Sequence, residues 1–226
     1  MNRRRFLVAA GAAGLAGCVG SSGGGSSDDT GGSTDDEPSG TPVSTHPAGA
    51  NLDAQPMLGE TTETLIIAFE DPSCTLCRRF EENTYPRIVS ELVDPGRASF
   101  VYRGYPIIYP WGEPATHVLE ATYAADADAF WALKDHYYAE QSTFSTENVY
   151  DASREFLASE TDVDAEAVVT AAQEGEADDA VALDVAAGEE LGIGQTPEFH
   201  LFADGVFRTT VRGAQGYSVF ESALGV

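Results

Sequence analysis

Two cysteines separated by two residues, Cys74 and Cys77, stand at a junction that limits how this chain folds. An apolar run at 65–69 precedes them and predicts a buried strand, and the pattern that follows predicts a helix over 75–92. Side chains three apart at a helix start lie on one face, a spacing that suits a disulfide with Cα atoms about 4.4–6.8 Å apart. The free N–H groups and positive dipole end there stabilise a thiolate at Cys74, the form that attacks disulfides. The pair therefore predicts thiol–disulfide exchange.

The first 17 residues have the features of an export signal rather than of a folded element. Three arginines at 3–5, with a twin-arginine match, precede an apolar stretch at 6–16 that is too short to span a bilayer. Residues 15–18, Leu-Ala-Gly-Cys, resemble the lipobox of exported lipoproteins. We therefore expect twin-arginine export and lipid on the Cys18 thiol, at the extracytoplasmic face of the cell membrane. Because one lipid chain anchors only weakly, more than one chain or a further contact is expected.

The charge and cysteine counts exclude some classes of partner. Lys and Arg number 12 against 37 Asp and Glu, which gives a formal net charge of −25, and Lys134 is the only lysine. Such a chain repels nucleic acid and anionic lipid surfaces. Abundant acids with almost no lysine resemble proteins of halophilic archaea, where molar salt shortens the Debye length to about 3 Å. With Cys18 at the processing site, no cysteine pair besides Cys74 and Cys77 is left for a structural disulfide.

Composition divides the remaining chain into a tether and one α/β domain. Residues 18–55 are rich in Gly, Ser, Thr, Asp and Pro and predict a flexible acidic linker. Residues 56–226 suit one domain, with a βαβ pattern, a helical insertion at about 112–191, and a final ββα pattern. The predicted strands are 64–69, 98–103, 199–202 and 206–211, with a hairpin turn at Asp204-Gly205, and the predicted helices are 75–92, 115–126, 127–141, 146–158, 164–173, 177–191 and 217–224.

Short motifs occur in a fixed order over residues 57–226. They are Phe69 to Cys77 followed by Phe80, then Tyr102 to Pro106, His117 with Ala121, Phe130-Trp131, and Thr196 to Phe199. Together they are similar to those of the DsbA-like branch of the thioredoxin superfamily. The resemblance implies a thioredoxin-like fold with an inserted helical subdomain. It also implies that Cys74 attacks, that Cys77 resolves, that Pro197 is a cis-proline facing the pair, and that Thr196 offers its backbone to the substrate.

Two positions differ from the pattern of these relatives. Many relatives have proline directly after the first cysteine, whereas this chain has Thr75-Leu76, so the resemblance does not fix the oxidising strength. Relatives often carry a buried proton-transferring acid six residues before the first cysteine, where this chain has Ala68. Glu70 or Asp71 is a candidate substitute, but we expect both to be strand-end acids that face solvent or cap the helix.

The resulting prediction is a monomeric protein thiol–disulfide oxidoreductase that needs no cofactor, because the cysteine pair itself carries the electrons. Its expected partners are exported proteins with thiols or disulfides and, by resemblance, a quinone-linked thiol oxidase of the membrane. Two thiolates are too few for a structural zinc site, which usually has four ligands. Two alternatives use the same pair: a Cu(I) metallochaperone with a histidine as third ligand, and a non-catalytic scaffold. The histidines are His46, His117, His136 and His200.

Overall fold

The computed structural model describes residues 40–60 and 63–226. The predicted export signal, Cys18 and the first part of the predicted linker lie outside the described residues. Within the described part of the chain, no helix combines the length and the apolar character needed to cross a membrane.

A mixed five-stranded sheet organises the domain, with the strand order β1-β3-β2-β4-β5. The parallel pair is β2 and β3, and the other neighbours run antiparallel. Both faces of β2, β3 and β4 are buried, which explains why β2 reads as a continuous apolar run. The sequence predicts the four longer strands but not β1, an edge strand of two residues. The bounds are β1 (Met57–Leu58), β2 (Leu65–Glu70), β3 (Ser99–Gly104), β4 (Glu198–Ala203) and β5 (Val206–Arg212).

One face of the sheet is covered by three helices, α1 (Thr75–Asn83), α2 (Tyr85–Ile88) and α8 (Tyr217–Leu224). The ring centroid of Phe80 on α1 lies 4.4 Å from that of Phe199 on β4 and 5.7 Å from that of Phe220 on α8. The ring planes are tilted by 47° in both pairs, and these aromatic side chains bury large apolar surfaces against one another. They hold the helix that follows the cysteine motif firmly on the sheet.

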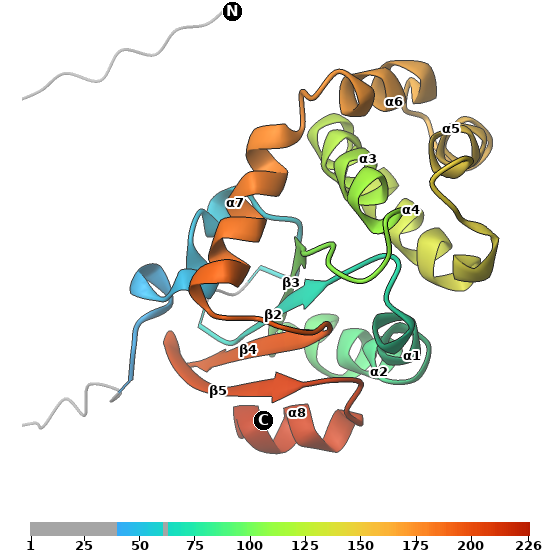
Figure 1. Ribbon diagram of the computed structural model, residues 1–226. Coiled ribbons are helices and arrows are strands. Elements are labelled where there is room, and N and C mark those ends of the chain that lie inside the picture. The colour runs from blue at the N-terminus through green and yellow to red at the C-terminus, as the bar shows by residue number, and fades with distance from the viewer. Residues whose placement is uncertain (1–39, 61–62) are drawn as a thin grey trace, which may run out of the picture. The chain divides into compact units, whose positions relative to one another are not determined.

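Five helices between β3 and β4 form the predicted insertion: α3 (Gly112–Ala125), α4 (Ala127–Ala139), α5 (Val149–Glu160), α6 (Ala165–Gln173) and α7 (Asp178–Glu190). The central helix α3 contacts α4, α5 and α6, whereas α7 returns to the sheet and contacts β3. Figure 1 shows α7 and α8 on opposite sides of β4 and β5. The prediction of an α/β fold with βαβ…ββα order and an inserted helical subdomain is confirmed.

The single helix predicted over 75–92 is wrong, because the structure interrupts it. α1 ends at Asn83, α2 follows, and the segment closes with a π-helical turn, η4 (Val89–Val93). The cause is Pro86, which lies in the first turn of α2. A proline is tolerated at that place, but inside a continuous helix it removes a hydrogen bond and clashes with the preceding turn.

The flexible linker predicted over 18–55 is wrong for residues 40–55, which pack on the second face of the sheet. They form three short 3-10 helices, η1 (Val43–Thr45), η2 (Pro47–Gly49) and η3 (Leu52–Ala54). The Val43 N–H donates to the Gly205 carbonyl at 3.0 Å, and Ala48 is fully buried in the apolar cluster on this face. The physical reason is that α7 leaves part of this apolar face uncovered, and the segment buries it.

Candidate active site

Cys74 is the N-cap residue of α1, directly after the turn that ends β2. Its backbone is extended, with φ −77° and ψ 121°, and its sulfur accepts a hydrogen bond from the Cys77 N–H at 3.4 Å. The sulfur therefore takes the place of the oxygen that usually caps a helix, where unpaired N–H groups face it. This position stabilises negative charge on the sulfur.

The four residues predicted to form the site lie together. The Cys74 thiol donates to the Thr196 carbonyl oxygen at 3.2 Å, although 122 residues separate the two in the chain. The Thr196–Pro197 peptide bond is cis, and Pro197 directly precedes β4. Both cysteines are free thiols; Cys74 is 3% exposed and Cys77 is completely buried. Only the first sulfur is therefore within reach of another polypeptide.

The surroundings of the two thiols shift their pKa values in opposite directions. The Cys77 thiol lowers the pKa of Cys74 to about 6, burial opposes this shift, and the Thr196 side chain with the N–H groups of Cys77 and Leu76 adds to it. Burial raises the pKa of Cys77, and the neighbouring Cys74 and the charge of Glu70 raise it further. Cys74 is thus the thiolate at neutral pH, and Cys77 keeps its proton.

The lowered pKa of Cys74 gives a testable pH dependence. The rate of alkylation of Cys74 in the reduced protein, where Cys77 is completely buried, should rise as the pH passes through about 6 and level off above pH 7, because only the thiolate reacts. A group with a lowered folded-state pKa also stabilises the folded reduced protein above its unfolded pKa, and this contribution is lost as the pH falls through about 6. Cys77→Ser removes the thiol that contributes most to this shift, so the midpoint for Cys74 in that variant should lie above that of the unmodified protein. A midpoint at or above about 8.5, the value of a free thiol, would show that the helix start does not activate Cys74.

Glu70 is fully buried, so the expectation that it faces solvent is wrong. It is the last residue of β2 and shares a face with Ala68, two residues before it, since strand side chains alternate. Burial raises the pKa of Glu70 strongly, the charge of Glu81 adds to the shift, and Lys134 opposes it. Neither oxygen of Glu70 meets a hydrogen-bond partner among the described residues, which disfavours the charged carboxylate. Glu70 therefore holds a proton beside Cys77.

The only lysine of the chain completes this buried cluster. Lys134, on α4, is fully buried, and its Nζ lies 2.5 Å from Oε2 of Glu81 on α1 and 3.8 Å above the Tyr85 ring. Burial lowers the pKa of Lys134, but the charges of Glu81, Tyr85, Asp135 and Glu70 together more than offset this, so the ammonium stays charged. The inserted helices thereby supply a cation beneath the helix that carries the cysteines. Sequence reasoning missed this link, although a lone lysine in a strongly acidic chain was a signal for it.

Asp71 is also buried, but it acts as a hydrogen-bond acceptor that organises the motif. Its Oδ1 accepts from the Ser73 N–H at 2.7 Å, and its Oδ2 accepts from the N–H groups of Ile107 and Ile108 at 2.9 and 2.7 Å. Asp71 thus ties the turn before Cys74 to the loop after β3. Both alternatives expected for Asp71 are wrong, because its side chain is buried and the residue that caps α1 is Cys74.

His200 does not supply a third ligand to the cysteine pair. Its ring lies 5.4 Å from His46, 5.7 Å from Phe69 and 6.0 Å from Phe207, on the face of the sheet opposite to the cysteines. His117 contacts Asp178, and His136 stacks on Phe156. Among residues 40–60 and 63–226, no group of three or more His, Cys, Asp or Glu side chains is placed to hold a metal.

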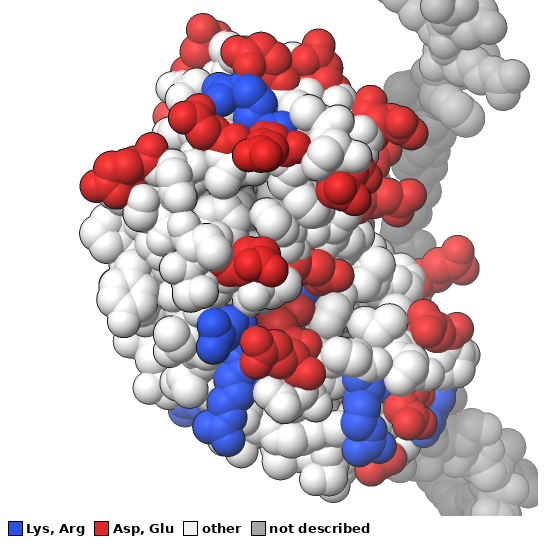
Figure 2. Space-filling view, turned by 90° about the vertical axis from the view of Figure 1, so that its right-hand side faces the viewer, with Lys and Arg blue, Asp and Glu red and all other residues white. Residues whose placement is uncertain are grey.

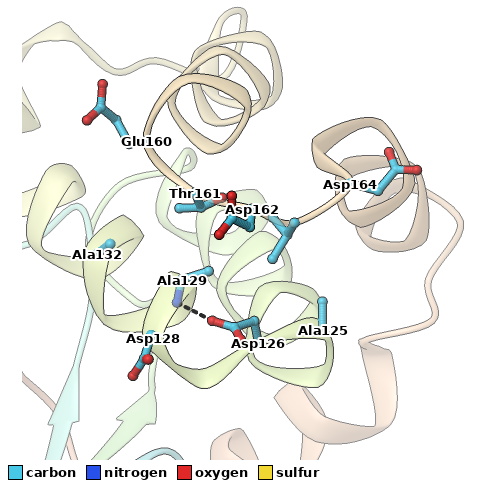
Figure 3. A pocket seen from close by; sticks show the side chains of 10 residues that line it. Ala125, Asp126, Asp128, Ala129, Ala132, Glu160, Thr161, Asp162 and Asp164 are labelled. Carbon is cyan, nitrogen blue, oxygen red and sulfur yellow. Dashed lines mark hydrogen bonds between the residues drawn. The ribbon is translucent and has the colours of Figure 1, made fainter.

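A separate cleft of about 600 Å³ lies in the helical insertion, at the start of α4 and the segment that joins α5 to α6. Asp126 accepts from the Ala129 N–H at 2.8 Å and Asp164 from the Ala167 N–H at 3.1 Å, so these two acids cap helices. No residue of the cysteine motif lines this cleft, and it has no part in the thiol chemistry. Figure 3 shows its acidic side chains, Asp126, Asp128, Glu160, Asp162 and Asp164.

A central mixed sheet, a Cys-X-X-Cys pair at a helix start and a cis-proline segment beside it define the class of thioredoxin-fold proteins. The chain belongs to the thioredoxin family, because the family model described as Thioredoxin matches residues 52–219.

The comparisons with individual proteins agree with this family. Probable disulfide bond formation protein D from Bacillus cereus is 29% identical over 76 residues, which cover 34% of this chain and 35% of that protein. The chain thus matches about a third of the length of this curated relative. The oxidised BdbD structure from Bacillus subtilis superimposes with a TM-score of 0.67 at 18% identity, covering 83% of this chain and 97% of that one. Wolbachia pipientis alpha-DsbA1 gives a TM-score of 0.62 at 19% identity, with coverages of 76% and 89%. At these identities the solved structures support the fold.

Proposed function

We propose that this protein is an extracytoplasmic protein thiol–disulfide oxidoreductase of the DsbA-like type, with Cys74 and Cys77 as its redox pair. The contrast between the two thiols is the observation that carries the proposal. Cys74, with a pKa of about 6, contacts the Thr196 backbone, whereas Cys77 is completely buried. A thiolate with a pKa near ambient pH is the best attacking group for disulfide exchange. The name of the Bacillus relative, a probable disulfide bond formation protein, supports the same activity.

In the oxidising direction, a substrate thiolate attacks Cys74 of the Cys74–Cys77 disulfide. The bond between the two protein sulfurs breaks, Cys77 leaves with the electron pair and takes up a proton, and a mixed disulfide with Cys74 forms. A second substrate thiolate then attacks the substrate sulfur of this mixed disulfide and releases Cys74 as a thiolate. The substrate loses two electrons and two protons in total, and the cysteine pair gains the electrons, so no cofactor is needed.

Glu70 is the proton donor to Cys77 in this scheme and the acceptor in the reverse direction. A buried leaving thiolate is costly without a proton, and Glu70 holds one next to it because burial raises the pKa of this carboxyl. Glu81 and Lys134 lie close to Glu70, and their charges hold its side chain in position. Thr196 and Pro197 present the backbone along which the substrate chain lies, as the family resemblance implies.

The direction of the reaction depends on the reduction potential of the pair. A value near −120 mV is typical of a strong oxidant such as DsbA, and one near −270 mV is typical of thioredoxin. We propose that the protein acts as a monomer on exported proteins and that a quinone-linked thiol oxidase of the membrane reoxidises it.

Catalytic turnover with a disulfide-bonded protein tests the proposed activity. Catalytic amounts of the protein should accelerate reduction of the substrate disulfide by dithiothreitol, and the acceleration should disappear in the double variant Cys74→Ser/Cys77→Ser. Rates equal to dithiothreitol alone, with a folded protein and intact thiols, would refute the oxidoreductase assignment. A scaffold would give this result.

Attachment to the membrane through Cys18 is part of the proposal and has its own test. Leu-Ala-Gly-Cys at 15–18 follows a short apolar stretch, and the folded domain begins soon after residue 39. Cys18→Ser should move the protein from the membrane fraction to the soluble fraction or block its processing, whereas Cys74→Ser should not change fractionation. Unchanged membrane association of Cys18→Ser with an intact N-terminus would contradict lipidation.

We also propose that the protein works at high ionic strength, as a protein of a halophilic archaeon does. The net charge is −25, and Figure 2 shows Asp and Glu spread widely over one face, outnumbering Lys and Arg there. Counterions at molar salt screen the repulsion among these acids. The melting temperature should therefore rise between about 0.1 M and molar KCl, as the Debye length falls from about 10 to about 3 Å. A melting temperature that does not change over this range would contradict this proposal.

A further inference from the structure

A cleft of about 450 Å³ opens directly beside the attacking cysteine. Ser73 and Thr75, the residues on either side of Cys74, both line it. A polypeptide joined to the Cys74 sulfur by a disulfide must therefore pass next to this cleft. The cleft is separate from Cys77 and from the buried acids, and no step of the proton transfer uses it.

The interior of the cleft is aromatic. Trp111 and Phe144 stack with ring centroids 5.5 Å apart and an interplanar angle of 26°, and each is only 8% exposed. The Tyr137 ring supports Phe144 edge-on at 5.1 Å. Tyr109, which is 54% exposed, stands at the rim. Such a floor offers the stacked and edge contacts that aromatic side chains prefer.

Polar groups line the remaining wall, and only one of the lining residues is charged. The hydroxyl side chains and the Gln141 amide suit a ring that carries an N–H or O–H group, such as Trp or Tyr. The charged residue is Arg78, whose guanidinium favours the face of an aromatic ring. Arg78 pairs with Glu82 at 3.4 Å, so a strongly acidic chain presents a nearly neutral cleft here. The polar lining residues are Ser73, Thr75, Gln141, Ser142, Ser145 and Thr146.

Both walls of the cleft are tied to the turn that carries Cys74, so the cleft is formed before a substrate arrives. The Tyr109 N–H donates to Oγ of Ser73 at 3.0 Å, next to the two bonds from the same loop to Asp71. From the other wall, Nε2 of Gln141 donates to the carbonyl oxygens of Pro72 and Cys74 at 2.8 and 3.0 Å. Gly112 permits this close approach, because a Cβ there would lie 2.4 Å from Oδ1 of Asp71.

The surface around the motif is also unusually apolar for this chain. Among the described residues, six large apolar side chains are exposed, and four of them belong to the cysteine motif or to the loop after β3. Exposed apolar groups that gather at one place mark an interaction site rather than ordinary surface. These four are Leu76, Ile107, Ile108 and Tyr109.

We propose that this cleft binds an aromatic side chain of the substrate polypeptide, close in sequence to the cysteine that exchanges with Cys74. This inference rests on the proposed oxidoreductase function and adds a preference among substrates. The aromatic ring of the substrate lies between Tyr109 and Phe144, above Trp111. Burial of this ring stabilises both the first complex with the substrate and the mixed disulfide. Substrates are therefore unfolded segments with Trp, Tyr or Phe near a cysteine, as occur in chains that have not yet formed their core.

A single-step reaction with peptide disulfides tests the preference. Reduced Cys77→Ser protein is mixed with symmetrical disulfides of short peptides that differ only in the residue before or after cysteine: Trp, Tyr, Leu, Ala or Glu. The Cys74 thiolate attacks one peptide sulfur, the peptide disulfide breaks, and one peptide thiolate leaves, so mass spectrometry counts one adduct per protein. We expect the Trp and Tyr peptides to react about tenfold faster than the Ala peptide, the effect of burying part of one aromatic side chain.

Variants locate the preference in the cleft. Ser142→Trp fills the cleft and Tyr109→Ala removes its rim, and in both the ratio of Trp-peptide to Ala-peptide rates should fall to within about twofold of unity. Leu183→Ala, an exposed apolar residue on α7, should keep the tenfold ratio and serves as the matched control. Equal rates for the Trp and Ala peptides, or a ratio that survives both cleft variants, would overturn the subsite while leaving the redox function intact. Failure of every peptide disulfide to react would instead overturn the proposed function.

Discussion

Replacing Cys77 with serine is expected to leave the protein covalently joined to its substrates. In the reducing direction Cys74 attacks first and forms a mixed disulfide, and Cys77 is the internal thiol that releases it. Because Cys77 is completely buried and its pKa is raised, it cannot replace Cys74 as the attacking group when Cys74 is lost. Cys74→Ser should therefore trap almost nothing, and its exchange activity should fall to the background rate.

Non-reducing gels of cells that carry each variant measure this asymmetry. Adducts should be abundant for Cys77→Ser, should disappear on treatment with dithiothreitol, and should be near zero for Cys74→Ser. The double variant is the matched control for adducts that involve other thiols. Similar, negligible adducts from both single variants would argue for a scaffold, whereas loss of bound copper from both would argue for a metallochaperone.

Glu70→Gln is expected to slow the step in which Cys77 releases Cys74, by about 100-fold or more at pH 7. A positioned acid or base typically contributes 10²–10⁴-fold, and Glu70 is the buried carboxyl that raises the pKa of Cys77 by its charge. We expect the lower end of that range, because burial raises the pKa of Glu70 and keeps it largely protonated, so only its ionised fraction accepts the Cys77 proton. The first attack by Cys74 should change little, since the pKa of Cys74 is lowered by the Cys77 thiol, the helix-start N–H groups and Thr196 rather than by Glu70.

Single-turnover kinetics with glutathione disulfide separate the two steps. The first glutathione released reports the attack by Cys74, and the second reports resolution by Cys77. Glu91→Gln, an exposed acid paired with Arg87 at 3.8 Å, is the matched control and should change neither rate. An unchanged second rate in Glu70→Gln would remove Glu70 from the mechanism and leave solvent as the acceptor of the Cys77 proton.

The strand and helix order could be predicted because it depends on local patterns. The apolar run before Cys74 gives a strand buried on both faces, and Asp204-Gly205 between two apolar runs gives the hairpin of β4 and β5. Both signals lie within a few residues of the structure that they specify. The position of Cys74 at a helix start is likewise specified by residues close to it in the sequence. The same holds for the lowering of its pKa by the N–H groups of that helix start.

The features that sequence reasoning missed all depend on contacts between distant segments. Residues 40–55 have a linker-like composition, yet they are ordered because the sheet face under α7 needs cover. Glu70 and Ala68 point to the same side of β2, so an acid two residues later can still lie near Cys77. Lys134 reaches Glu81 only because the insertion folds back over α1. Residues 40–55 and Lys134 lie far in the sequence from the segments they contact, whereas Glu70 is close to Cys77 in the sequence but becomes buried only through the packing around β2.

Transfer of the Cys74–Cys77 disulfide to a reduced polypeptide is the decisive measurement of the proposed activity. The protein with its Cys74–Cys77 disulfide formed is mixed at a one-to-one ratio with a reduced, unfolded polypeptide that contains two cysteines, in molar salt at pH 7. Thiols are then alkylated, and both chains are weighed by mass spectrometry. We expect the polypeptide to gain one disulfide for each Cys74–Cys77 disulfide that the protein loses, and both protein cysteines then to be alkylated. A polypeptide that keeps its two thiols while the Cys74–Cys77 disulfide persists would contradict the proposed oxidoreductase activity.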